Sequence, residues 1–531
     1  MLMKKNGRRM ADDRMIRTEY RGKTVTTLLL VLLTVVFAGC MSLPGLQREF
    51  VRPTGIGPEY RNVFDEVAES IPERMKQNKI PGLSIAVVDS NGILWSAGYG
   101  RTGRGKHPVT PETLFSIQSM SKTFTATAVM IAVQDGLVDL DTPITKYLPD
   151  LTVNSRWEDK PQQKMTLRHL LTHTAGFTHE APVGNNLDNH YGSFEEHAMS
   201  ISDTWLKDRV GARSSYSNLG IDLAAYILQV KSGMTFAEYM KKKIFDPLGM
   251  PTSSVDYDFV EQHEDRALGH MPFVAEVPVA IPMVGAGGVY TSSAELSRFV
   301  QFHLNRGTID GRRLLEAKLI DTMYTSSPIS PGTGLGIGIH KKHDTYYLTH
   351  SGGGYGFLTT MKWYPEYGIG CVVLTNSVSH DSEHGKISNE ILDELISEKI
   401  VMKDASGNIP PAEELISKDA KLPELPESEK VHTPTPYNPE WGRYKGTYRF
   451  IAKGYKVGLP VRLAFALGYC DPGIKLTVVK KDGYLCIGDE KLEEYQPGLF
   501  FTSLGEALDF RGAAATWRNI KLEKSLFFWS F

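Results

Sequence analysis

A lysine and three serines lie within one short segment, FSIQSMSKTF at residues 115–124. On a helix, residues three or four positions apart share a face, while immediate neighbours point in different directions. Only Ser119 stands three positions before Lys122; Ser121 is adjacent to the lysine, and Ser116 is expected in the strand or turn before the helix. A serine hydroxyl beside a lysine amine is typical of an activated nucleophile and its base.

The residues after this segment predict a buried helix that would position the pair. The stretch TFTATAVMIAVQDG is small or apolar almost all round, and Gly136 is a typical helix end. Ser119 would open this helix, where the positive end of the dipole favours an oxyanion. Burial disfavours the charged ammonium of Lys122, so we expect a neutral amine that accepts the hydroxyl proton. Because Ser-x-x-Lys arises by chance about once or twice in a chain this long, the motif alone is weak.

Two later motifs supply the other groups that acyl transfer needs, a proton relay and donors for an oxyanion. Tyr-Ser-Asn at 216–218 follows a loop and precedes an apolar helix. His-Ser-Gly-Gly at 350–353 closes a predicted strand, where glycines let a substrate backbone approach closely. Taken alone, Tyr216 would be interpreted as a packed loop residue and Asn218 as a helix cap.

The surrounding elements predict one domain whose two ends share a sheet. Strand-like runs occur near both ends of the region before residue 403, and the middle, about 119–305, is mainly helical with loops. A Pro-, Glu- and Lys-rich stretch then has the composition of a semi-rigid linker, and short strand-like pieces after it predict a small antiparallel barrel. The expected elements are a helix at 59–79, a hairpin at 82–100, strands at 346–354, 357–365 and 368–376, and a helix at 383–400.

The N-terminus has the pattern of an export signal. A basic leader precedes the apolar run TVTTLLLVLLTVVF at 24–37, which is too short for a membrane span. Small residues before Cys40 resemble the lipobox of bacterial lipoproteins, in which the cysteine is lipidated. Phe37 departs from the usual aliphatic residue, so a plain signal peptide is the alternative, and translation from Met10 or Met15 is a further one.

Length and composition limit the number of domains and the kinds of partner that the chain can have. The 531 residues leave room for two or three domains, and a formal charge of −2 gives no reason to expect a nucleic-acid partner. Apart from Cys40 there are three cysteines, which is too few for a disulfide framework, although Cys470 and Cys486 are able to pair.

In this order, the motifs resemble those of the serine β-lactamase and penicillin-binding-protein superfamily, in its class C-like branch. The resemblance extends to TLRHLLTHTAG at 166–176 and GAGGVYTSSAELSRF at 285–299, and covers about 60–400. It implies an α/β fold, a three-layer sandwich with a mainly antiparallel sheet and a helical subdomain. It implies no cofactor and no metal. The segment after Trp441 resembles the lipocalin-like barrel of some relatives, for which a packing or oligomerisation module without a ligand is the alternative.

The resemblance also implies a role for each site residue. Ser119 is acylated, Lys122 and Tyr216 share the proton transfers, and the backbone N–H groups of Ser119 and Gly353 form the oxyanion hole. The implied catalytic residues are Ser119, Lys122, Tyr216 and His350, and the implied substrate-binding residues are Asn218, Ser351, Gly352 and Gly353.

His350 departs from the lysine that many members carry. Histidine titrates near neutrality, so it is expected either to hold a substrate carboxylate as the imidazolium or to relay protons with Tyr216. Histidine is familiar in esterase-like and D-aminopeptidase-like members, and no equivalent of the class A deacylating glutamate is recognisable. A zinc site on His169 and His173, four residues apart, is a competing hypothesis, but the sequence offers neither HExxH nor an obvious third ligand.

The sequence therefore predicts an exported, lipid-anchored serine hydrolase. Its substrate would be a D-amino-acid peptide, a cell-wall fragment or a small ester, and weak β-lactamase activity is compatible with the motifs. The alternative is a non-catalytic penicillin-binding-like surface lipoprotein. The sequence does not fix the oligomeric state. The expected domains are a signal peptide at 1–40, a tether at 41–57, the hydrolase domain at 58–402, the linker at 403–440 and the barrel at 441–531.

Overall fold

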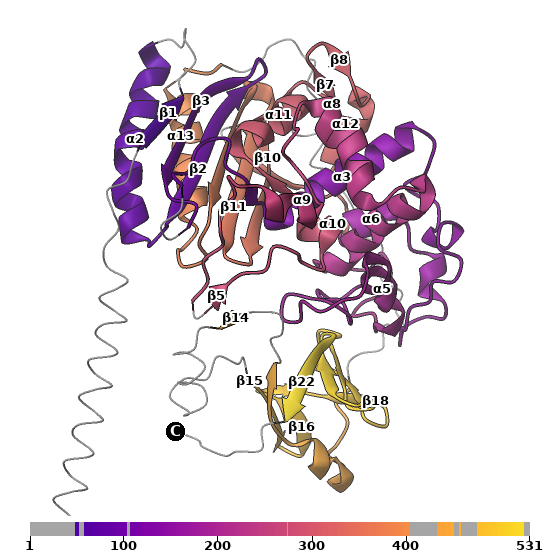
Figure 1. Ribbon diagram of the computed structural model, residues 1–531. Coiled ribbons are helices and arrows are strands. Elements are labelled where there is room, and N and C mark those ends of the chain that lie inside the picture. The colour runs from indigo at the N-terminus through magenta and orange to yellow at the C-terminus, as the bar shows by residue number, and fades with distance from the viewer. Residues whose placement is uncertain are drawn as a thin grey trace, which may run out of the picture. The chain divides into compact units, whose positions relative to one another are not determined.

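The computed structural model of the protein describes residues 48–51, 58–103, 107–272, 274–342, 344–398, 400–402, 433–450, 456–457 and 475–524 (Figure 1). The expected signal peptide, Cys40 and most of the linker lie outside these residues. Within them, no helix combines the length and apolar character needed to cross a membrane. The thiols of Cys371 and Cys486 are free and buried.

A seven-stranded antiparallel sheet organises the first domain (Figure 1). Strand β12 pairs with β2 from the other end of the domain, which confirms that both ends of the chain segment share one sheet. The predicted hairpin is β2 and β3, and the three later strands are β10, β11 and β12. The order is β1 (Arg48–Val51), β3 (Ile93–Gly100), β2 (Gly82–Asp89), β12 (Ile369–Thr375), β11 (Phe357–Tyr364), β10 (Thr345–Gly354) and β9 (Gly338–Lys342).

Helices cover both faces of this sheet. Helices α2 (Pro58–Gln77) and α13 (Glu383–Ser397) pack together on one face, where Arg74 of α2 forms an ion pair with Glu383 at 2.6 Å. Helix α11 (Ser293–Leu304) packs against β2 and β12 on the opposite face. The sheet has apolar side chains on both faces, so each face needs helices to bury them. The layered α/β fold is therefore as predicted.

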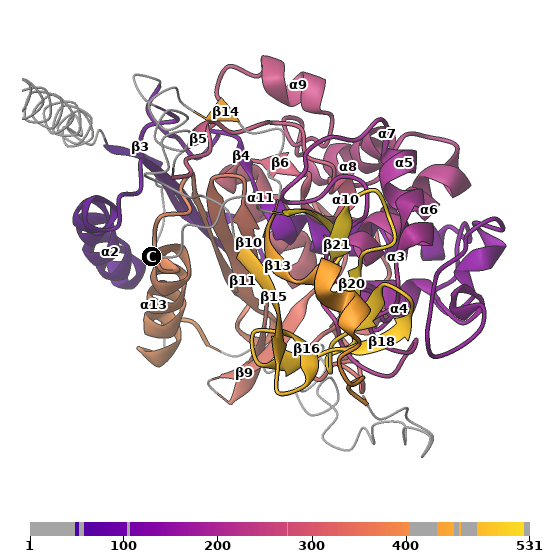
Figure 2. The ribbon, with the colours of Figure 1, turned by 90° about the horizontal axis from the view of Figure 1, so that it is seen from below.

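The helical subdomain lies between β3 and β9 in the chain and holds the buried helix α3 (Ser121–Gln134). Figure 2 shows α3, α6 and α10 beside one another on the same side of the sheet. Helix α3 is buried on nearly every side, as its composition predicts. The other helices are α4 (Leu167–Leu171), α5 (Phe194–Met199), α6 (Asn218–Ser232), α7 (Phe236–Met240), α8 (Asp246–Leu248), α9 (Tyr257–Gln262), α10 (Val284–Gly287) and α12 (Ala317–Tyr324).

Nine of the C-terminal strands form a second, barrel-like antiparallel sheet, as predicted, whereas β14 (Lys456–Val457) pairs with β5 (Val274–Glu276). The nine-stranded sheet has its own apolar core, in which Trp441 and Tyr444 pack edge-on against Phe500. The order is β17 (Glu490–Lys491), β16 (Tyr484–Ile487), β15 (Lys475–Lys481), β13 (Gly446–Phe450), β22 (Ile520–Lys524), β21 (Ala515–Trp517), β20 (Ala507–Asp509), β19 (Leu499–Phe501) and β18 (Glu493–Gln496).

Candidate active site

Of the three clustered serines, Ser119 is the one that contacts the lysine. Its Oγ lies 3.0 Å from Lys122 Nζ, in a 3₁₀ turn (Gln118–Met120) that runs directly into α3. Ser121 Oγ instead accepts a hydrogen bond from the backbone N–H of Val289 at 3.0 Å. Ser116 Oγ lies 2.7 Å from the side-chain amide of Gln118. Ser121 and Ser116 therefore hold the local structure, whereas Ser119 is partly exposed next to a buried amine.

The amine of Lys122 is fully buried and has two further partners. It donates to the side-chain carbonyl of Asn218 at 2.8 Å and to the backbone carbonyl of Ala286 at 2.9 Å. A neutral amine has two N–H bonds and one lone pair, so two carbonyl acceptors leave the lone pair directed at the Ser119 hydroxyl. The same geometry also accepts an ammonium that donates three bonds. The site therefore accommodates Lys122 both before and after it accepts the proton of Ser119.

The turn that presents Ser119 is set by close backbone packing. Gln118 has a φ of 50°, a left-handed conformation that a residue with a side chain adopts only where its surroundings impose it. The hydroxyl of Thr359 donates to the Ile117 carbonyl at 3.0 Å, which ties β11 to the residue before the turn. Strand β10 approaches so closely that a Cβ on Gly352 would lie 2.0 Å from the same carbonyl.

Gly352→Ala is therefore expected to lower both stability and activity. The added methyl group must push β10 away from the Ser119 turn, and overpacking of this kind costs about 1–3 kcal/mol of unfolding free energy. Chemical denaturation and the rate of fluorophosphonate labelling measure the two effects. Gly385→Ala in α13 is the matched control, because a Cβ there meets nothing within 4 Å. Equal behaviour of the two variants would contradict the close approach.

Tyr216 borders the same amine from the other side. Its ring centroid lies 4.8 Å from Lys122 Nζ, and the side chain is 41% exposed. The rings of His173 and His179 flank it, with centroids at 4.5 and 5.5 Å. Ser217 caps α6 by accepting from the backbone N–H of Gly220, so the helix starts at Asn218 and directs that amide at the lysine.

The histidines of the competing zinc hypothesis each have a structural partner. His173 Nδ1 accepts the backbone N–H of Ser217 at 3.2 Å, and burial lowers its pKa well below the usual value. His169 Nδ1 lies 3.0 Å from the hydroxyl of Thr166. Among the described residues no group of three potential metal ligands occurs. His173 thus positions the loop that carries Tyr216.

His350 lies on β10 near the site, but its charge differs from the sequence-based expectation. Its Nδ1–H donates to the Ser351 carbonyl at 2.9 Å. Burial, followed by the positive charge of Lys122, lowers the pKa of His350 to about 4. A histidine that titrates near neutrality was expected; the lowered pKa of this half-buried side chain instead favours the neutral imidazole at pH 7, because an imidazolium would lose hydration and would be repelled whenever Lys122 is protonated.

The remaining predicted residues lie on the same strand. Ser351 is exposed, and its hydroxyl lies 3.2 Å from that of Thr360 on β11. Gly353 is also exposed, and Gly352 is buried against the Ser119 turn. The structure therefore brings the three motifs of the sequence together around one serine.

Two features of the site were not predicted from sequence. The Ala286 carbonyl is a backbone group, so no side chain signals its role as a lysine acceptor. Asp222, one turn after Asn218 on α6, is fully buried and bonds to the backbone of Gly285 and Ala286. Its one sequence signal is a lone carboxylate within the apolar stretch LGIDLAAYIL, from which it was not predicted.

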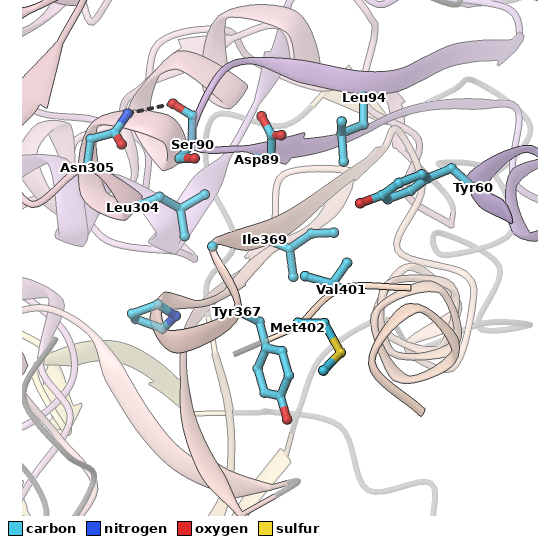
Figure 3. A pocket seen from close by; sticks show the side chains of 12 residues that line it. Tyr60, Asp89, Ser90, Leu94, Leu304, Asn305, Tyr367, Ile369, Val401 and Met402 are labelled. Atoms are coloured by element: carbon cyan, nitrogen blue, oxygen red, sulfur yellow. Dashed lines mark hydrogen bonds between the residues drawn. The ribbon is translucent and has the colours of Figure 1, made fainter. Parts of the chain in front are cut away.

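A separate hollow of about 370 Å³ lies elsewhere on the first domain (Figure 3). Tyr60, Leu94, Tyr367 and Met402 are among the side chains around it. None of the predicted site residues lines it, so it is distinct from the cluster around Ser119.

Comparison with known proteins identifies the family of the chain. The family model described as Beta-lactamase matches residues 67–394. The chain is 27% identical over 305 residues to Beta-lactamase-like protein 2 of Dictyostelium discoideum, a match that covers 55% of this chain and 52% of that protein. It is 30% identical over 245 residues to a Beta-lactamase of Yersinia enterocolitica, covering 45% of this chain and 59% of the relative. The chain thus spans little more than half the length of these relatives.

Solved structures show the same fold. The octameric penicillin-binding protein homologue from Pyrococcus abyssi is 21% identical, with a TM-score of 0.54, and the match covers 87% of this chain and 98% of that one. The D-amino acid amidase from Ochrobactrum anthropi SV3 is 23% identical, with a TM-score of 0.53, covering 64% and 99%. The predicted β-lactamase/transpeptidase-like fold is confirmed. With a family match over most of its first domain, the chain belongs to the beta-lactamase family, whose members are serine hydrolases.

Proposed function

We propose that the protein is a serine hydrolase that forms an acyl-enzyme on Ser119. The observation that carries this proposal is the contact of 3.0 Å between Ser119 Oγ and the buried Lys122 Nζ, which two carbonyl groups hold in place. Ser119 Oγ attacks the substrate carbonyl carbon as its proton passes to Lys122. The tetrahedral intermediate then collapses, the bond to the leaving group breaks, and that group takes a proton from Lys122 directly or through Tyr216.

Deacylation reverses these roles. A water molecule attacks the ester carbon, loses a proton to the same base, and the bond to Ser119 Oγ breaks with return of a proton to the serine. We assign the oxyanion donors to the backbone N–H groups of Ser119 and Gly353. A single donor of this kind contributes about 10²–10³ to kcat in other hydrolases. Ser351 and Gly352 would border the substrate along β10.

The substrate class that the site favours is an ester or amide without a carboxylate next to His350. The lowered pKa of His350 favours its neutral form at pH 7, which offers no cation to such a group, and Lys122 is in contact with Ser119. This favours a small ester or an amide of a D-amino acid over a substrate held by its C-terminal carboxylate. The alternative is a non-catalytic surface protein. Burying a lysine amine is costly, and such a protein would gain nothing from placing it next to a serine hydroxyl.

A direct test compares substrates on the purified chain. We expect turnover of p-nitrophenyl acetate and of D-alanine p-nitroanilide, with slower turnover of a peptide ending in D-alanyl-D-alanine and of nitrocefin. Turnover of the last two substrates alone would contradict the substrate class. No turnover of any of them, together with no labelling by a fluorophosphonate, would support the non-catalytic alternative.

The charge of His350 gives a pH prediction. Its pKa of about 4 lies below the range pH 6–8, so the imidazole stays neutral there, and wild-type KM for mono-p-nitrophenyl succinate should not change across it. His350→Lys adds a cation and should lower KM for that substrate by about tenfold, the size expected of one charge-assisted hydrogen bond. p-Nitrophenyl butyrate, which lacks the carboxylate, is the matched control and should show no such gain. If the wild-type KM for the succinate instead rises from pH 6 to pH 8, His350 binds the substrate carboxylate as an imidazolium and this prediction is wrong.

The finer family features are part of the same proposal. The Tyr-x-Asn motif beside Lys122 supports the class C-like branch, and the separate nine-stranded sheet supports a lipocalin-like C-terminal domain. We also propose export and lipid attachment at Cys40, which rest on the sequence alone.

Attachment at Cys40 predicts where the protein is found after expression in a bacterial host. Acylation needs the cysteine thiol, so the wild-type chain should sediment with membranes, whereas Cys40→Ala should be released from them. Immunoblots of both fractions measure this. Equal release of the two proteins would indicate a plain signal peptide.

A further inference from the structure

A buried ion pair lies behind the site, on two helices that carry none of the predicted site residues except Asn218. The side chains of His197 on α5 and Asp222 on α6 are both fully buried, and His197 Nε2 lies 3.2 Å from Asp222 Oδ2. The other imidazole nitrogen, Nδ1, lies 2.8 Å from the Val183 carbonyl, which accepts only. Both ring nitrogens thus face acceptors, an arrangement that suits the imidazolium.

The charge of this pair has a clear physical origin. Burial acts to lower the pKa of His197, but the hydrogen bond and charge of Asp222 outweigh it, and the net shift is upward. Placing a charged pair in an apolar region is costly, and replacement by apolar residues is often neutral for stability. The backbone groups that Asp222 binds therefore explain the pair better than stability does.

The second oxygen of Asp222 fixes the backbone turn that faces Lys122. Oδ1 accepts the backbone N–H groups of Gly285 and Ala286 at 2.8 and 2.9 Å. The turn packs closely against α6: a Cβ atom added to Gly285 would lie only 2.5 Å from Ala225 Cβ. The turn therefore has no room to shift toward α6. From the other side, Thr125 of α3 donates to the Gly285 carbonyl at 2.7 Å.

This turn delivers one of the two carbonyl acceptors of the lysine. The carbonyl of Ala286, whose N–H is bonded to Asp222, accepts from Lys122 Nζ at 2.9 Å. Asn218, four residues before Asp222 and so on the same face of α6, supplies the other acceptor at 2.8 Å. One helix therefore determines both acceptors, the first directly and the second through Asp222.

We infer that Asp222, held by His197, is a positioning residue that directs Lys122 toward Ser119 through the Ala286 carbonyl. The inference rests on the proposed acylation of Ser119. Without the carboxylate, the two N–H groups lose their acceptor and the turn is free to rotate its carbonyl away from the amine. The lysine then retains Asn218 alone, and its lone pair is no longer fixed on the serine.

The test is the kinetics of inactivation of the full chain by a fluorophosphonate. In this reaction the bond from Ser119 Oγ to phosphorus forms, the phosphorus–fluorine bond breaks, fluoride leaves, and the serine proton passes to Lys122. Asp222→Ala should lower the maximal inactivation rate by about 10²-fold, the cost of a displacement of about 1 Å in a catalytic group. The inhibitor concentration at half-maximal rate should stay unchanged, because binding precedes proton transfer.

Two further variants separate positioning from general damage. Asp222→Asn keeps an oxygen acceptor for both N–H groups and should recover most of the lost rate. Leu228→Ala removes a fully buried side chain further along α6 and should destabilise the protein without slowing inactivation. An Asp222→Ala rate equal to that of Leu228→Ala, or an Asp222→Asn rate no faster than that of Asp222→Ala, would overturn the inference.

If Asp222→Ala does not fold, His197→Gln takes its place. This variant removes the imidazole that holds Oδ2 of Asp222. It should slow inactivation by about tenfold without changing inhibitor binding, because Lys122 is displaced less than in Asp222→Ala. An unchanged rate would overturn the inference. Failure of the proposed function looks different: the wild-type chain itself would not react at Ser119.

Discussion

Ser119→Ala is expected to reduce hydrolysis of p-nitrophenyl acetate by at least about 10⁴-fold in kcat, the scale of loss when a hydrolase nucleophile is removed. The reason is geometric, since Ser119 Oγ is the serine oxygen in this segment that contacts Lys122 Nζ. Initial rates over a range of substrate concentrations measure the effect. Binding should persist, because the alanine variant keeps the glycines and Asn218 around the site.

The neighbouring serines serve as controls for this prediction. Ser121→Ala removes an acceptor for the Val289 N–H, and Ser116→Ala removes the partner of the Gln118 amide. Both changes should lower stability while leaving kcat within about tenfold of wild type, because neither serine contacts the amine. Full activity of Ser119→Ala, or loss of activity in Ser121→Ala alone, would show that the nucleophile lies elsewhere.

Lys122→Met is expected to lower kcat by about 10²–10⁴-fold, the contribution typical of a general base. Methionine has a similar length and suits the apolar surroundings, but it neither accepts the serine proton nor donates to Asn218 and Ala286. Each of these buried carbonyl groups then lacks a donor, at a cost of about 1–3 kcal/mol, offset in part because no amine remains to be buried. Steady-state kinetics and denaturation should be measured together.

Lys362→Met is the matched control for Lys122→Met. Lys362 is also a buried lysine, on β11, where it bonds to Asn389 and lies 4.2 Å above the ring of Tyr347. Its replacement should change stability and leave kcat unaltered. If Lys122→Met hydrolyses the ester as fast as Lys362→Met does, the lysine is not the base.

Much of the fold was predictable because its signals are local. Two strand-like runs on either side of Asn91-Gly92, a typical hairpin turn, predicted the hairpin of β2 and β3, and the small apolar residues after Lys122 predicted that α3 is buried. Strand-like runs near both ends of the domain predicted that both ends contribute strands, and the structure shows that β2 pairs with β12. The short strand-like pieces near the C-terminus predicted the second sheet, which has its own apolar core.

The site was predictable where side chains carry the chemistry, and not where backbone or environment does. The spacing of Ser119 and Lys122 selected the correct serine for the contact. The Ala286 carbonyl has no sequence signature, since any residue offers one. The lowered pKa of His350 depends on its partial burial and on the nearness of Lys122, two facts that only the folded chain establishes.

The most direct test of the central claim is to locate the adduct after reaction with a fluorophosphonate. Cleavage with trypsin gives a peptide that ends at Lys122 and contains Ser116, Ser119 and Ser121. Fragment masses from this peptide should place the whole adduct on Ser119. In Lys122→Met, where the corresponding tryptic peptide extends to Lys146, no adduct should form over the same reaction time. An adduct on Ser116 or Ser121, on another peptide, or on no residue at all would contradict the assignment of Ser119 as the nucleophile.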